Sequence, residues 1–180
     1  MIRRFFTNPA VRLALRLVLV LRAATLIIAA WGGIVHPAQI DWARQPVFNV
    51  IGETITAQGA AYAFVEPWFR WDTGWYAFIA HDGYATNIDS IIFPPLYPTL
   101  MRGLAPIFGG DYIVSGLVIS TVALFFALVF LFKIVAADEN ERIARWAVIA
   151  LALYPASFFL LAAYTESLFL ALMLGAWWMV

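Results

Sequence analysis

Residues 112–135 read YIVSGLVISTVALFFALVFLFKIV, a 24-residue run in which the first charge is Lys133. As an α-helix this run would be about 36 Å long, at roughly 1.5 Å per residue. The hydrocarbon core of a bilayer is about 30 Å thick, so the run predicts a transmembrane helix. The composition agrees, because 64% of the 180 residues are hydrophobic and only 12% are charged. Soluble domains carry about twice that share of charge, so we expect an all-α integral membrane protein.

Three further apolar runs predict spans over about residues 13–33, 146–163 and 168–180. The first run contains Arg22, which we interpret as a snorkelling side chain, with pairing to a lipid phosphate as the alternative. A cleaved signal peptide is a weaker interpretation of this run, since no small-residue cleavage site follows it. The fourth run is still apolar where the sequence stops. We therefore expect residues 1–180 to form a single transmembrane domain, the N-terminal part of a longer protein.

The distribution of charge predicts the orientation. The first 22 residues hold five arginines and no acid, and the link between the second and third spans holds Arg142 and Arg145. By the positive-inside rule both segments, and with them the N-terminus, are cytoplasmic. The loop over about residues 34–111 and the short link at 164–167 then lie outside. We expect a multi-pass protein of the plasma membrane in a prokaryote, or of the endoplasmic reticulum in a eukaryote.

The long outer loop is too apolar to be a plain connector. Asp72 stands where a helix N-cap belongs, and Gly83 is suited to end that helix. Within it Trp71, Trp75, Phe78 and Asp82 follow helical spacing, which predicts an aromatic stripe at the headgroup level and a helix lying along the interface. The prolines at 94–98 predict a second interfacial helix that ends before Gly109-Gly110.

The acidic residues of the outer side have more than one interpretation. Asp72 is either a simple cap, a catalytic carboxylate or both, and His81 with Asp82 reads as a solvated helix end or as part of a binding site. If residues 72–82 form one helix, Asp72 and Asp82 are about 15 Å apart along its axis. That separation is too large for a shared metal ion or for a glycosidase pair, so we expect one dominant carboxylate. Glu166, between two apolar runs, needs water or a partner.

Other kinds of site are missing from the sequence. There is no cysteine, which excludes disulfides and thiolate sites. Neither a His-Glu-x-x-His zinc motif, a P-loop nor a Gly-x-Ser-x-Gly elbow is present. We therefore assign no metal ligand and expect no cofactor other than a co-substrate.

Three blocks, in order, resemble the PIG-V mannosyltransferase family, whose members add the second mannose in GPI-anchor assembly, together with their prokaryotic relatives. The blocks cover about residues 70–170. They are Arg70-Trp71-Asp72-Thr73-Gly74-Trp75-Tyr76 with Ile79-Ala80 and Asp82-Gly83-Tyr84, then Phe93-Pro94-Pro95-Leu96-Tyr97-Pro98, and finally Tyr154-Pro155-Ala156-Ser157 with Tyr164-Thr165-Glu166-Ser167-Leu168-Phe169.

The resemblance implies a polytopic helical bundle of the GT-C glycosyltransferase superfamily, here with about four spans. It implies a glycosyltransferase that moves a sugar, expected to be mannose, from a polyprenyl-phosphate donor such as dolichyl-phosphate mannose to a lipid-linked or glycan acceptor. The reaction takes place on the extracytoplasmic face. The full enzymes carry more spans, so residues 1–180 alone would leave the donor groove incomplete.

The resemblance also assigns roles to residues. Asp72 matches the catalytic base of the first outer loop, which takes the proton of the acceptor hydroxyl. Arg70 and Arg102 are candidates for stabilising the departing lipid phosphate. The remaining substrate-binding candidates are Trp71, Trp75, Tyr76, His81, Asp82, Tyr97, Tyr164 and Glu166. No metal is implied, because the leaving phosphate stays on a lipid.

Two other classes of function remain open at the level of sequence. A transporter segment shows the same hydropathy, and Pro155, within the predicted third span, is the feature that points to it. A non-catalytic partner of a membrane assembly is the third class. The substitution Asp72→Asn separates enzyme from transporter, since only an enzyme is expected to need this carboxylate.

Overall fold

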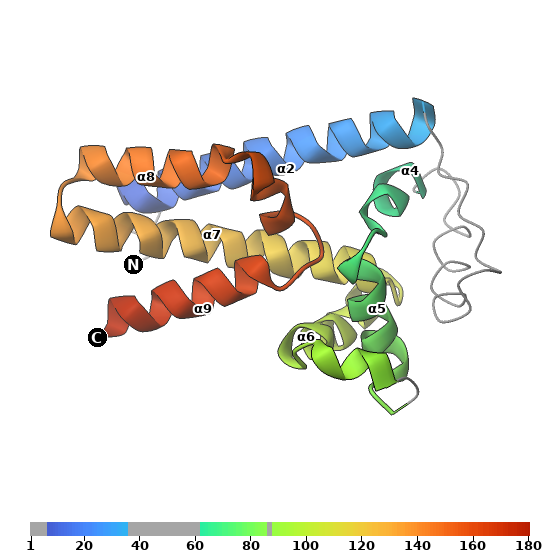
Figure 1. The fold of residues 1–180 in the computed structure, drawn as a ribbon. Coiled ribbons are helices and arrows are strands. Elements are labelled where there is room, and N and C mark those ends of the chain that lie inside the picture. The colour runs from blue at the N-terminus through green and yellow to red at the C-terminus, as the bar shows by residue number, and fades with distance from the viewer. Residues whose placement is uncertain (1–6, 36–61, 86–87) are drawn as a thin grey trace. The chain divides into compact units, whose positions relative to one another are not determined.

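The computed structural model of the protein describes residues 7–35, 62–85 and 88–180, and these ranges are helical without any strand. The chain divides into two compact units. Unit one comprises residues 1–24, 120–161 and 165–180, and unit two comprises residues 25–119 and 162–164. Figure 1 shows the elements of both units, and each unit is described by itself below.

Two helices, α2 (Pro9–Val35) and α7 (Tyr112–Asp138), are the ones in the described part of the chain that are long and apolar enough to cross a membrane. Each has 27 residues and is therefore about 40 Å long. Helix α9 (Glu166–Met179) is apolar but has only 14 residues. The structure is thus all-helical and consistent with a helical membrane protein, and two of the four predicted spans have the length to cross a bilayer by themselves.

The sequence caps both long helices at their starts. The Asn8 side chain accepts a hydrogen bond from the Ala10 backbone N–H (2.9 Å), and Pro9 occupies the first helical position. The Asp111 carboxylate accepts one from the Val114 N–H (2.9 Å). Each cap satisfies an N–H group that the helix itself leaves without an acceptor.

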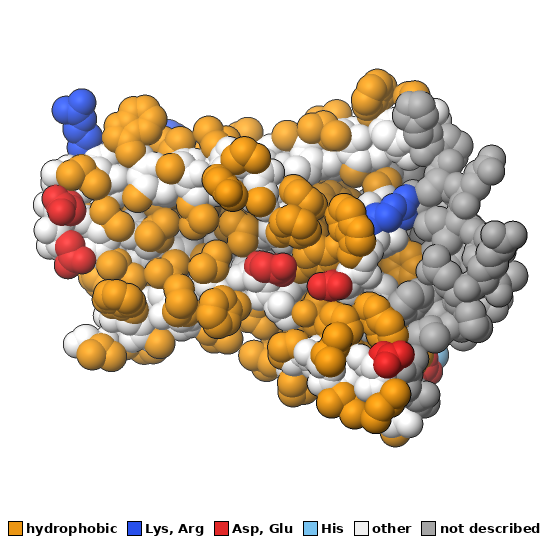
Figure 2. All heavy atoms as spheres, in the orientation of Figure 1, with side chains coloured by type: hydrophobic (Ala, Val, Ile, Leu, Met, Phe, Trp, Pro, Cys, Tyr) orange, Lys and Arg blue, Asp and Glu red, His pale blue; other side chains and the backbone are white. Residues whose placement is uncertain are grey.

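Apolar side chains of α2 are exposed along most of the helix. Leu19, Ile27 and Trp31 keep 59%, 68% and 65% of their surface accessible. Hydrophobic side chains also cover most of the face drawn in Figure 2, where charged groups are few. Apolar surface in contact with water costs about 25 cal/mol of free energy per Å², whereas contact with lipid acyl chains removes this cost.

Unit one is held together by an apolar core between α2, α7, α8 (Glu141–Leu153) and the 3₁₀ segment η7 (Pro155–Leu160). Within this unit the Arg22 guanidinium donates to the hydroxyl of Thr121, from Nε at 3.0 Å and Nη2 at 2.6 Å. The snorkelling that we expected for Arg22 is therefore not what the structure shows. A hydroxyl on the neighbouring helix receives the guanidinium instead.

The predicted span over 146–163 is not one continuous helix. Helix α8 begins earlier, at Glu141, where the Asn140 side chain caps it, and it ends at Leu153. Tyr154 adopts an extended backbone (φ −59°, ψ 138°), as the residue before a proline prefers. At the break the Ser157 N–H donates to the Tyr154 carbonyl at 2.8 Å, and the Ser167 hydroxyl donates to the Leu160 carbonyl at the end of η7.

Unit two contains the part of the outer loop that the structure describes. Its elements are α4 (Tyr62–Val65), η4 (Glu66–Trp68), α5 (Asp72–Asp82), η5 (Ile88–Ile92), α6 (Leu96–Leu104) and η6 (Ala105–Phe108). Helices α5 and α6 lie against one another. Both were expected from the sequence, as was the end of the second helical segment at Gly109, which has a left-handed backbone (φ 66°, ψ 22°). Loop residues 36–61 and 86–87 lie outside the described residues.

Helix α5 does not carry the exposed aromatic stripe that its spacing predicted. Phe78 is 5% exposed, and the residues from Tyr76 to Ala80 are all buried. Trp71 precedes the helix rather than forming part of it. This helix is thus packed into unit two by most of its surface, and its exposed groups are concentrated at its two ends.

Candidate functional site

A tight turn leads into α5, with Trp71 in a backbone conformation that is rare for any residue except glycine (φ 46°, ψ −123°). The Thr73 N–H donates to the Arg70 carbonyl at 3.1 Å and closes the turn. Glycine dominates this position of a type II′ turn, so a tryptophan here stores backbone strain. Such strain is concentrated at functional sites in proteins.

The turn places two exposed groups side by side in the chain. Trp71 is 71% exposed, and Asp72 is also exposed. Asp72 is the first residue of α5 rather than its N-cap, which corrects our expectation, and Trp71 occupies the cap position without a capping side-chain bond. The Thr73 hydroxyl that follows is buried and has no hydrogen-bond partner within the described residues. The Asp72 carboxylate and the Trp71 indole are therefore both accessible at the start of α5.

The Tyr164 side chain reaches this turn from the end of the sequence. Its hydroxyl donates to the Arg70 carbonyl at 3.1 Å, across 94 positions of the chain. The Arg70 guanidinium itself donates to the Phe69 carbonyl at 2.9 Å. The first and last of the three sequence blocks therefore meet within unit two, at the residue that precedes the strained tryptophan.

Four aromatic rings join α5 to the start of α6. Trp75 stacks on Phe93 (centroids 5.6 Å apart), and Tyr76 contacts both Phe93 and Tyr97 edge to face (5.2 Å each). Tyr97 is fully buried and donates to the Gly116 carbonyl at 2.8 Å. Tyr76 and Tyr97, which we expected at the substrate, therefore pack inside unit two, where they support α5.

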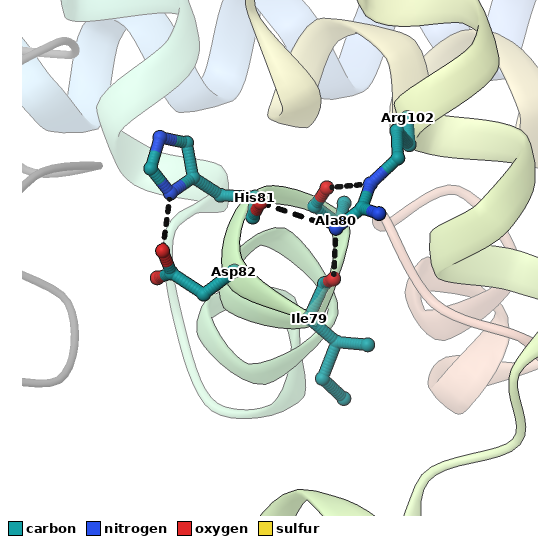
Figure 3. A network of polar contacts seen from close by, with 5 residues as sticks. All are labelled: Ile79, Ala80, His81, Asp82 and Arg102. Carbon is teal, nitrogen blue, oxygen red and sulfur yellow. Dashed lines mark hydrogen bonds and ion pairs between the residues drawn. The ribbon is translucent and has the colours of Figure 1, made fainter. Parts of the chain in front are cut away.

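The opposite end of α5 carries a second polar cluster (Figure 3). His81 Nδ1 lies 2.8 Å from Asp82 Oδ1, and both side chains are about one-third exposed. The His81 ring also meets Tyr112 edge to face at 5.8 Å. Arg102 of α6 donates to the backbone carbonyls of Ile79, Ala80 and His81, so its guanidinium caps the C-terminus of α5.

Because α5 runs unbroken from Asp72 to Asp82, its ends are about 15 Å apart along the axis. The structure brings Arg70, Trp71, Asp72 and Tyr164 together at one end of the helix. It places His81, Asp82 and Arg102 at the other end. Glu166 belongs to unit one, where it is exposed at the first position of α9.

Two features of this site were not predicted from sequence. The positive φ at Trp71 could not be predicted from the residue type, since glycine is the residue that usually adopts a positive φ. The His81 and Asp82 side chains are neighbours in sequence, but only the structure shows that they pair. Within residues 7–35, 62–85 and 88–180 there is no group of three or more acidic or histidine side chains suited to hold a metal ion.

No protein-family model, no curated protein and no solved structure matches this chain.

Proposed function

We propose that the protein is a membrane glycosyltransferase that uses a polyprenyl-phosphate sugar, with mannose as the expected sugar. The observation that carries this proposal is the strained turn at Trp71, which presents an exposed carboxylate at the start of α5. The sequence blocks that resemble the PIG-V family contribute to the same turn, through Arg70 to Asp72 and through Tyr164.

In the proposed reaction Asp72 acts as general base. The acceptor hydroxyl gives its proton to the Asp72 carboxylate as its oxygen bonds to the anomeric carbon of the sugar. The bond between that carbon and the phosphate oxygen breaks, and the electron pair leaves with the lipid phosphate. An exposed side chain at a helix terminus is accessible to such an acceptor.

The residues around Asp72 have distinct tasks in this proposal. The exposed indole of Trp71 offers an apolar face for a sugar ring, and Tyr164 fixes the turn through the Arg70 carbonyl. Arg70 is the better candidate of the two arginines for the departing phosphate, because it lies two positions from Asp72. Arg102 lies at the far end of α5, where its Nε and Nη2 donate to backbone carbonyls.

The test is sugar transfer by the full-length protein carrying Asp72→Asn. We expect the rate to fall by roughly 10²- to 10⁴-fold, the usual contribution of a general base, with little change in thermal stability. Asp89→Asn in η5, another exposed outer-loop aspartate, is the matched control and is expected to keep the wild-type rate. Unchanged transfer by Asp72→Asn would rule out the base.

A transporter segment is the second candidate, and the interruption of the helix at Pro155 favours it. Broken helices often line the binding sites of transporters. A transporter is expected to be indifferent to Asp72→Asn and sensitive to substitutions around Tyr154 and Pro155. Transport assays in proteoliposomes with both sets of variants therefore distinguish the two candidates.

A further inference from the structure

A small cavity lies between the C-terminal end of α5 and the middle of α6. Its volume is about 150 Å³, and it is lined by Ile79, Gly83, Tyr84, Pro98, Thr99 and Arg102. Pockets for drug-sized ligands are several times larger, about 300 to 1,000 Å³. The cavity therefore has room for one small chemical group but not for a drug-sized ligand.

The Arg102 guanidinium is fixed in this cavity before any ligand binds. Its Nε donates to the Ala80 carbonyl, and its Nη2 donates to Ile79 (3.3 Å) and His81 (3.1 Å) (Figure 3). Its third nitrogen, Nη1, makes no hydrogen bond to the described residues. A helix C-terminus carries only about half of an elementary negative charge, and Arg102 is the one charged side chain among the six residues that line the cavity.

Two hydroxyl groups complete the polar lining. Thr99 donates to the Pro95 carbonyl (2.7 Å), four positions back in the chain, and Tyr84 donates to the Phe93 carbonyl (2.8 Å). Hydroxyl protons rotate, and a bond of the Thr99 kind is readily exchanged for a better acceptor. Burial raises the pKa of Tyr84 above its ordinary value of 10.0, so this hydroxyl keeps its proton at neutral pH.

We propose that this cavity binds one phosphate group, held by Nη1 of Arg102 and by the Thr99 hydroxyl. A phosphate oxygen is a charged acceptor, and a guanidinium and a hydroxyl are the donors that such an acceptor prefers. The ordering of Arg102 costs little on binding, since three carbonyls already hold the side chain. The phosphate is either that of a lipid headgroup or a free phosphate ion.

This phosphate is separate from the one that departs in the proposed reaction. Along α5, Ile79 to His81 lie about 10 to 13 Å from Asp72. In the proposed reaction the base contacts the acceptor oxygen, which itself lies roughly 3 to 3.5 Å from the anomeric carbon that carries the leaving phosphate oxygen. The proposed phosphate site is therefore independent of the proposed function, and an experiment that disproves one of them does not disprove the other.

The first experiment measures the melting temperature of the full chain in maltoside detergent as inorganic phosphate is added, against chloride at equal ionic strength. We expect phosphate alone to raise the melting temperature, as any ligand of the folded state does. Thr99→Val keeps the shape but lacks the donor, and its apparent affinity should fall about tenfold. Thr99→Ser restores the hydroxyl and should recover most of the binding.

The second experiment identifies the source of the phosphate. Phosphatidic acid and diacylglycerol with the same acyl chains are added separately in the same detergent. Stabilisation by phosphatidic acid but not by diacylglycerol or inorganic phosphate assigns the cavity to a lipid headgroup, and stabilisation by inorganic phosphate assigns it to the free ion. The proposal is overturned if neither phosphate compound stabilises the protein, or if Thr99→Val responds as the wild type does.

Discussion

The backbone of Trp71 is the most informative single-residue feature of the molecule. A φ of 46° with ψ −123° costs a non-glycine residue about 1 to 3 kcal/mol. The chain keeps a large exposed indole there although glycine would relieve the strain. We infer that tryptophan occupies this position because its exposed indole, next to Asp72, has a function of its own.

The comparison of Trp71→Gly with Trp71→Ala separates the backbone from the indole. Both variants lose the ring, and only glycine relieves the strained conformation. We expect Trp71→Gly to be more stable than Trp71→Ala by about 1 kcal/mol, and both to lose sugar transfer. Thermal unfolding followed by intrinsic fluorescence measures the difference. Equal stability of the two variants would show that position 71 is not strained.

The hydrogen bond from Tyr164 to the Arg70 carbonyl gives a second prediction for a single residue. Tyr164→Phe removes the donor and leaves the partly buried Arg70 carbonyl with one partner fewer, which we expect to cost about 1 kcal/mol of unfolding free energy. Because the same turn positions Asp72, the rate of sugar transfer should fall as well. Tyr154→Phe removes the hydroxyl of an exposed tyrosine and should change neither quantity; equal effects of the two variants would contradict this role.

At the scale of elements, apolar runs and turn residues predicted most of the helices. The run at 112–135 became α7, and the prolines at 94–98 and Gly109-Gly110 delimit α6 and η6. The predicted third span is not one continuous helix, because Pro155 interrupts the backbone at Tyr154. Hydropathy averaged over a window does not register one proline. Likewise, the spacing of aromatics along α5 did not reveal that α6 buries them.

The sequence supplied candidate residues for the site but not their arrangement in space. Asp72, Trp71 and Tyr164 were identified from their sequence blocks, and the structure adds the turn that joins them. Arg102 was assigned to a phosphate at Asp72, but its contacts place it at the other end of α5. Long-range contacts of this kind depend on the tertiary fold and leave no trace in local sequence spacing.

Two glycines in neighbouring helices give opposite predictions for the same substitution. A Cβ at Gly116 in α7 would lie 2.8 Å from the Ala163 Cβ and 3.2 Å from the Tyr97 hydroxyl. We expect Gly116→Ala to cost about 1 to 3 kcal/mol through overpacking. Gly103 in α6 has open space around it, so Gly103→Ala should stabilise the protein by about 0.5 to 1 kcal/mol. Thermal unfolding in detergent checks both signs, and a neutral Gly116→Ala would contradict this packing of α7.

At the scale of the whole molecule, the orientation in the membrane decides where any chemistry takes place. Helix α7 is about 40 Å long, so its two ends lie on opposite sides of a bilayer that it crosses. The segment after it carries Arg142 and Arg145, and the positive-inside rule assigns that segment to the cytoplasm. We therefore expect Asp82, which precedes α7, to lie outside, together with the turn at Trp71.

The absence of cysteine from the sequence makes this orientation directly testable. Single cysteines replace the exposed residues Asp82 and Glu139, and sealed cells are treated with a membrane-impermeant maleimide. We expect Asp82→Cys to react at once and Glu139→Cys to react only after the membrane is permeabilised. The reverse pattern would place Asp72 in the cytoplasm and exclude an extracytoplasmic donor site. Immediate reaction of both cysteines would show that α7 does not cross the bilayer, because a 27-residue spanning helix cannot expose both ends to one compartment.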